Sequence, residues 1–195
     1  MADDDTERLA DYVRIIKLMS DFHYRDTGEW DRLRTLFHPE SMVHLMWFDG
    51  TGHAFVDAVS HLTDTDVTSK HIIATPVIEF GGHRATAETN AILVTENTAL
   101  GYGCTTHIRF LDRLLKEGST WTIAERRSVY DASFIDRAPT DPLEVGDFPR
   151  EYAALAHVLT RSGIPVHGTY PVRGSDAELI IRTNNNNWLN QTSPL

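Results

Sequence analysis

The sequence predicts an α+β protein in which helices pack on the concave side of a curved antiparallel sheet. Two observations support this fold class. The helix-like segments come first, with a single strand among them, and a run of strand-like segments follows. Tight turns at Gly81-Gly82 and at residues 116–119 join long strands, which favours antiparallel neighbours over βαβ units. Such a cone encloses a pocket between sheet and helices, a usual site for a small ligand.

Three helices are expected in the first 62 residues. Apolar side chains recur at helical spacing from Asp5 or Thr6 to Tyr24, and Gly28 provides a C-terminal stop. A second short helix is expected over residues 29–37 and a third over residues 55–62, after a turn at residues 49–52. The expected strands are residues 41–48, 69–80, 85–99, 101–115 and 120–130.

The pattern changes after residue 131. We therefore expect one domain over residues 1–131, followed by an extension over residues 132–195 that wraps the core or a neighbouring subunit. Within the extension, residues 138–142 read as a loop and residues 152–159 as an amphipathic helix. Residues 163–174 look irregular, and the asparagine run from Asn184 to Asn187 looks poorly ordered.

Composition excludes several classes of function. The formal net charge of -10 argues against binding to nucleic acid or to anionic lipid, because both need clustered Lys and Arg. Cys104 is the single cysteine, so no internal disulfide is possible. The N-terminus is acidic where a signal peptide would be basic, and no apolar run is long enough to span a bilayer. We expect a cytoplasmic protein that binds a small molecule.

Asp26 and His71 are the strongest candidates for chemistry. In helical phase, Asp26 points in the same direction as Tyr12, Met19 and Phe22, so its carboxylate faces the interior, where it needs a partner. His71 lies on a predicted strand and shares a face with later apolar residues. A carboxylate beside an imidazole fixes the tautomer of the ring and makes it a general base near neutral pH. Alternatively, Asp26 caps the next helix and His71 is a structural residue.

Other chemistries find less support. The ten histidines include no HExxH pair, and a metal would have to be assembled in space from His44, His71 and His107. Cys104 reads as a small buried residue, there is no GxSxG elbow, and the paired glycines lack a following helix that would hold a phosphate. We therefore expect no metal and no cofactor.

The order of motifs resembles a known superfamily. The segment from Asp26 to Leu33, the Phe37-His38-Pro39 break, a strand, a helix and the segment from Ser69 to Ile73 are similar to the SnoaL-like branch of the nuclear transport factor 2-like fold. From Phe22 to about Ile73 the sequence resembles the enzyme scytalone dehydratase, and the resemblance to the superfamily covers about residues 6–132.

The resemblance implies a catalytic pair formed by Asp26 and His71. It also shows departures. The two tyrosines that position water in scytalone dehydratase fall on Arg25 and Leu45, and a second catalytic histidine falls on Thr95. Polar residues of a later strand fall near Thr105 and His107. The pair carries over, but scytalone as the substrate does not.

Our hypothesis is a cofactor-independent lyase, most simply a dehydratase, acting on a small hydrophobic or aromatic hydroxylated substrate. Its catalytic residues would be Asp26 and His71. The expected substrate-binding residues are Phe22, Arg25, Leu45, Trp47, Ile73, Leu93, Thr95, Thr105 and His107.

Several alternatives remain open on the same fold. They are a C–C lyase that releases formaldehyde from lignin-derived diaryl compounds, an isomerase or cyclase, a ligand-binding module without catalysis, and a partner like the small subunit of aromatic-ring dioxygenases. Open sheets of this kind bury their outer face by association, so a homodimer or homotrimer is expected.

Overall fold

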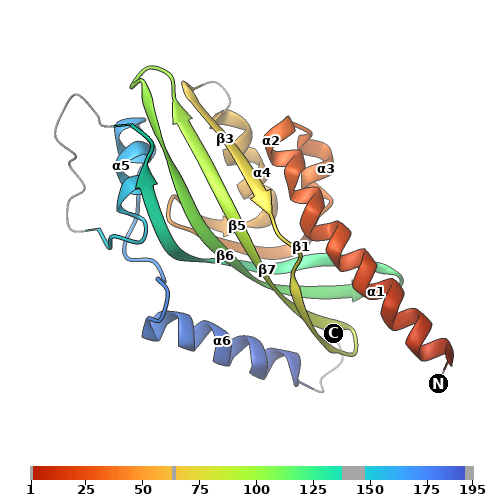
Figure 1. Ribbon diagram of the computed structural model, residues 1–195. Helices are drawn as coiled ribbons and strands as arrows, with labels where there is room; N and C mark the ends of the chain where they lie inside the picture. Colours follow the sequence, from red (N-terminus) through yellow and green to blue (C-terminus); the bar gives the residue numbers. More distant parts are fainter. Residues whose placement is uncertain (1, 63–64, 138–147, 192–195) are drawn as a thin grey trace.

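A seven-stranded sheet forms the centre of the computed structural model, which describes residues 2–62, 65–137 and 148–191 (Figure 1). The sheet runs in the order β2-β1-β7-β6-β5-β3. At its edge, β3 pairs with residues 91–97 of β5, and β4 pairs with residues 84–88 of the same strand. It is curved and unclosed, with helices packed against it, which confirms the α+β class. The strands are β1 (Phe37–Leu45), β2 (Phe48–Thr51), β3 (Val67–Ile73), β4 (Val77–Gly81), β5 (Arg84–Asn97), β6 (Tyr102–Glu117) and β7 (Thr120–Ile135).

The long strands β5, β6 and β7 form the predicted antiparallel meander. Gly82 and Gly118 occupy positive φ angles, of 66° and 60°, in the turns of the β4–β5 and β6–β7 hairpins, a conformation that glycine adopts without steric cost. β1 departs from the antiparallel expectation, because it pairs in parallel with β7. That pairing joins segments about eighty residues apart, such as Phe37 and Ile123, and no local pattern indicates it.

Two strand predictions were wrong in detail. The expected strand over residues 69–80 is divided into β3 and β4, because Pro76 lies between them and lacks an N–H for the ladder. The turn expected at residues 49–52 falls earlier, at Met46 and Trp47, between β1 and β2. Thr51 instead ends β2 and caps the next helix by accepting a hydrogen bond from the Ala54 N–H (3.2 Å).

The N-terminal helices line one face of the sheet. They are α1 (Ala2–Ser20), a 3₁₀ turn η1 (Asp21–His23), α2 (Tyr24–Thr27), α3 (Trp30–Arg34) and α4 (Gly52–His61). The apolar stripe of α1 is only half buried. Ile15, Leu18 and Met19 lie in the core, whereas Leu9 and Val13 are exposed.

After β7 the chain contributes to both faces of the sheet. α5 (Ala153–Arg161) contacts β6 and β7 and adds Leu155 and Leu159 to the main core. α6 (Asp176–Leu189) lies across the opposite face, where Ile181 packs against Leu111 and Val129 (Figure 1). The expected boundary at residue 131 falls inside β7. The predicted loop over residues 138–142 lies outside the described residues.

The asparagine run is ordered, contrary to our expectation. Asn184 to Asn187 belong to α6, which Ser175 caps at its N-terminus. Asn185 is buried and accepts a hydrogen bond from the Nε of Arg113 (2.8 Å). Contact with the sheet therefore supplies the helix stability that asparagine lacks intrinsically. Among the helices of the described chain, none is both long and apolar enough to cross a membrane.

Candidate functional site

Asp26 reaches the interior from α2, immediately before the chain turns. Gly28 ends this helix in the left-handed conformation (φ +72°), which reverses the chain and presents Asp26 to β3. The Asp26 side chain is only 10% exposed. Both of its carboxylate oxygens face one residue, His71: Oδ1 lies 2.8 Å from the ring Nδ1, and Oδ2 accepts from the backbone N–H at 2.6 Å.

His71 lies in the edge strand β3, opposite Leu93 of β5, and its side chain is 8% exposed. The ring of Phe22 meets the imidazole edge-on, with centroids 5.3 Å apart. Because the Asp26 carboxylate can only accept at Nδ1, the neutral imidazole carries its proton there and its lone pair on Nε2. Nε2 makes no hydrogen bond to any residue that the structure describes.

The environment keeps this imidazole neutral. Burial lowers the pKa of His71, the hydrogen bond to Asp26 opposes that effect, and the positive charge of Arg25 reinforces it, so the pKa lies below its ordinary value. Burial alone would raise the pKa of Asp26, but hydrogen bonds and charge from His71, together with Arg25, lower it. At neutral pH the pair is therefore a carboxylate and a neutral base.

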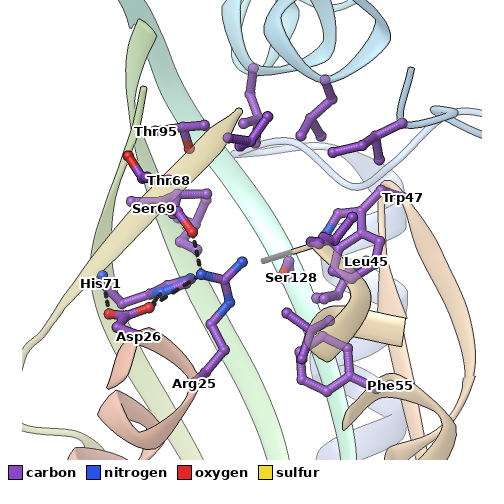
Figure 2. A pocket seen from close by; sticks show the side chains of 18 of the residues that line it. Arg25, Asp26, Leu45, Trp47, Phe55, Thr68, Ser69, His71, Thr95 and Ser128 are labelled. Carbon is purple, nitrogen blue, oxygen red and sulfur yellow. Dashed lines mark hydrogen bonds and ion pairs between the residues drawn. The ribbon is translucent and has the colours of Figure 1, made fainter. Parts of the chain in front are cut away.

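Arg25 lies beside the pair. Its Nη1 is 3.3 Å from Oδ1 of Asp26 and donates to the hydroxyl of Ser69. The side chain is 15% exposed, and burial lowers its pKa. Figure 2 shows the guanidinium extending from the pair toward the opposite wall of the pocket.

A cavity of about 250 Å³ opens between the helices and the sheet. One side is polar, with Arg25, Thr68, Ser69, His71 and Thr95 near one another (Figure 2). The opposite side is apolar and aromatic. Its wall includes Leu45, Trp47 and Phe55. Other lining residues are Phe22, Asp26, Trp30, Val59, Leu62, Thr65, Val67, Leu93, Ile108, Phe110, Ser128, Tyr130, Leu155, Leu159 and Ile164.

A second charged pair lies beneath this cavity. Arg126 donates from Nε and Nη2 to both oxygens of Asp112, each at 2.8 Å, and both side chains are fully buried. The Arg126 guanidinium lies over the rings of both Phe22 and Phe110, at 4.4 and 4.2 Å from their centroids. This charge also lowers the pKa of His71.

Most of the sequence-predicted binding residues lie together. The structure places Phe22, Arg25, Leu45, Trp47, Leu93 and Thr95 in the cavity wall with Asp26 and His71.

Three other predicted residues lie elsewhere. Ile73 is the last residue of β3 and packs against the core beyond the cavity. Even-numbered residues of β6, such as Ile108 and Phe110, face inward, so Thr105 and His107 face outward. His107 is exposed and its ring contacts Phe134.

Sequence reasoning missed part of the wall. Ser69 is two residues before His71, so strand alternation could have placed it on the same face. Leu155, Leu159 and Ile164 come from the extension, and no local pattern indicates that they close the cavity.

No cluster of three or more His, Cys, Asp or Glu residues suited to a metal ion occurs within residues 2–62, 65–137 and 148–191. His44, His71 and His107, the alternative metal set, do not come together. His44 instead bonds Asp49 (2.8 Å).

Solved structures share this fold. A candidate scytalone dehydratase from Novosphingobium aromaticivorans superposes with a TM-score of 0.61 over 74% of this chain and 98% of its own, at 17% sequence identity. A hexachlorocyclohexane dehydrochlorinase, type 2, gives a TM-score of 0.63 over 72% of this chain and 99% of its own, at 12% identity.

Sequence comparison gives the family. An uncharacterized protein of Aspergillus terreus is 32% identical over 80 residues, and the match spans 40% of this chain but only 30% of that relative. The model of the SnoaL-like domain matches residues 7–127, which hold Asp26, His71 and six of the seven strands in full. This protein therefore belongs to the SnoaL-like domain family.

Proposed function

We propose that this protein is a cofactor-independent lyase that removes water from a small hydrophobic or aromatic hydroxylated substrate. The observation that carries the proposal is the commitment of both Asp26 oxygens to His71, which leaves Nε2 as the acceptor in a largely apolar cavity. A base of this kind can take a proton from carbon when the site also stabilises the resulting charge.

In the proposed reaction, Nε2 of His71 removes a proton from a carbon next to a carbonyl group or aromatic ring. The C–H electron pair moves into the conjugated system, and Asp26 stabilises the imidazolium through Nδ1–H. Arg25 provides positive charge for the developing oxyanion, since Thr105 and His107 face away from the cavity. The imidazolium then protonates the departing hydroxyl, so one water leaves and a C=C bond forms.

The names of two structures that share the fold are consistent with an elimination, because one is called a dehydratase and the other a dehydrochlorinase. Their sequence identity to this chain is low, so the likeness itself concerns the fold. The support for proton transfer comes from the geometry of Asp26 and His71.

Hydrogen exchange tests the proposed base without knowledge of the leaving group. The protein is incubated in D₂O with a panel of apolar and aromatic hydroxy-carbonyl compounds, and mass spectrometry follows both deuterium uptake and loss of water. Removing a positioned base costs about 10²–10⁴-fold in rate, so His71→Ala is expected to lose exchange by that factor. The matched control is His44→Ala, which removes another aspartate-bonded histidine that does not line the cavity.

Near-normal exchange in a folded His71→Ala variant would refute the mechanism. Tight binding by the wild type with neither exchange nor water loss across the panel would instead indicate a ligand-binding module.

A further inference from the structure

Arg25 has hydrogen-bonding capacity that the protein itself does not use. Its Nη1 donates to Asp26 and Ser69, whereas Nε and Nη2 make no hydrogen bond to any part of the chain described by the structure. These two nitrogens form the edge of the guanidinium that matches a carboxylate. Figure 2 shows one terminal nitrogen directed away from the Asp26–His71 pair, toward the middle of the pocket.

In two other arginines of this molecule, the edge formed by Nε and Nη2 donates to a carboxylate. Arg126 holds Asp112 through Nε and Nη2, at 2.8 Å each. Arg109 holds Asp131 in the same way, with Nε at 3.0 Å and Nη2 at 2.8 Å from the carboxylate. Arg25 therefore differs from both in lacking a carboxylate at this edge, although it lies in a cavity where charge is costly.

Asp26 does not neutralise the open side of Arg25. Its two oxygens already accept from the ring and backbone of His71, and its contact with Arg25 is the longer one, at 3.3 Å, to Nη1 only. The carboxylate thus lies behind the guanidinium as seen from the cavity (Figure 2). Besides Asp26, the polar groups that line the cavity near Arg25 are Thr68, Ser69, His71 and Thr95, and none of these four is anionic.

We propose that Arg25 binds the carboxylate of an apolar or aromatic monocarboxylic acid, whose body fills the wall formed by Leu45, Trp47 and Phe55. This deepens the proposed function by naming the class of substrate. The cavity of about 250 Å³ suits a ligand of one or two rings. A carboxylate at Arg25 places the carbon atoms nearest to it beside His71, so the proton removed lies within a few bonds of the acid group.

Binding measurements test this class without any turnover. The probes are two matched pairs, benzoate with benzamide and naphthalene-2-carboxylate with naphthalene-2-carboxamide. Trp30 and Trp47 line the cavity, so their fluorescence reports binding, and calorimetry confirms it. In at least one pair the wild type is expected to bind the carboxylate about 10–100-fold more tightly than the amide, as a charge-assisted bidentate contact requires.

Arg25→Gln is expected to reduce this preference to near unity by weakening only the carboxylate. Arg25→Lys keeps the charge without the fork and should retain part of the preference. Arg34→Gln is the matched control, because Arg34 pairs with Asp57 outside the cavity and its loss should leave the preference unchanged. Circular dichroism and melting curves establish that each variant is folded.

Three results would overturn the proposal: equal affinity of the wild type for acid and amide, no carboxylate binding at millimolar concentration, or an equal loss of both ligands in Arg25→Gln. The last result would mean that Arg25 only positions Asp26. Since the preference is a binding property, it is expected to persist in His71→Ala. Exchange that survives in His71→Ala would therefore refute the proposed base while leaving the carboxylate site intact.

Discussion

Replacing Asp26 by asparagine is expected to reverse which ring nitrogen of His71 carries the proton. In the native pair both oxygens accept, one from the backbone N–H of His71 and one from Nδ1–H. An asparagine has only one acceptor. If its oxygen keeps the backbone contact, its NH₂ faces Nδ1, which must then become the acceptor, and the ring proton moves to Nε2. The nitrogen that faces the cavity is then a donor and no longer a base.

The reversed tautomer should reduce the reaction rate far more than it reduces stability. An imidazole held in the wrong tautomer costs about 10⁴-fold in rate in the serine-protease triad, which corresponds to about 5.5 kcal/mol of transition-state stabilisation. A hydrogen bond to a charged group contributes only about 1.5–3 kcal/mol to the free energy of unfolding, so the melting temperature should drop by about 3–12 °C for a chain of this length.

Nitrogen-15 NMR of the imidazole ring reads the tautomer directly and needs no substrate. At neutral pH, His71 of the wild type is expected to show a protonated Nδ1, and Asp26→Asn a protonated Nε2. The matched control is Asp49→Asn, which breaks the His44–Asp49 pair at the surface and should leave the His71 signals unchanged. A wild-type His71 that is protonated at Nε2, or doubly protonated at neutral pH, would refute our assignment of the base.

Four further outcomes are expected. Because the His71 pKa is lowered, activity should persist as the pH falls below 6.5 and should decrease only when the base becomes protonated. A pH–rate profile in which activity already declines above pH 6.5 as the pH falls would contradict this prediction. Burial would raise the pKa of Glu178, but hydrogen bonds from Arg109 and other donors lower it to about 2. The free energy of unfolding should therefore decline as the pH falls from about 4.5 toward 2. The variant Glu178→Gln should melt about 5 °C lower than the wild type and lose that pH dependence. A Cβ at Gly103 would lie 2.0 Å from the backbone oxygen of Thr95, so Gly103→Ala should severely destabilise the chain. Gly101 has open space around it but a positive φ of 72°, so Gly101→Ala should cost only about 1 kcal/mol of unfolding free energy. We also propose that a second copy covers the outer sheet face, where Ile72, Val94 and Phe134 are exposed; light scattering should show a dimer or trimer, and Phe134→Glu a monomer.

The fold could be predicted where its signals are local. The alternation of β6 and β7 and the glycine turns beside them are visible in the sequence, and they define the meander. The parallel contact of Phe37 with Ile123 is not visible, because it depends on which strand edge remains free once the sheet has formed. The order of α6 likewise depends on a distant partner, since Arg113 holds Asn185 against the sheet.

The site was predictable to a similar extent. Helical phasing correctly predicted that Asp26 faces the interior, even though a 3₁₀ turn interrupts the helix. The choice of His71 as its partner rested on the family resemblance. The prediction that His107 lines the cavity was wrong. Strand alternation shows that neighbouring residues face opposite sides of the sheet, but it does not show which side faces the cavity. That choice becomes visible only with the packing of Phe110 against Phe22.

The charges around His71 bear on which kind of proton transfer the site favours. Burial and the charges of Arg25 and Arg126 all disfavour the imidazolium, and Asp26 alone stabilises it. A ring in this setting is unprotonated at neutral pH and ready to accept a proton, but it releases that proton readily once it holds it. A one-way abstraction would gain nothing from the second property. An elimination uses both, because the same nitrogen first takes the proton from carbon and then returns it to the departing hydroxyl. The placement of His71 between one carboxylate and two arginines therefore suits a reaction in which one nitrogen takes a proton and then returns it, which holds for the proposed loss of water and also for an isomerisation.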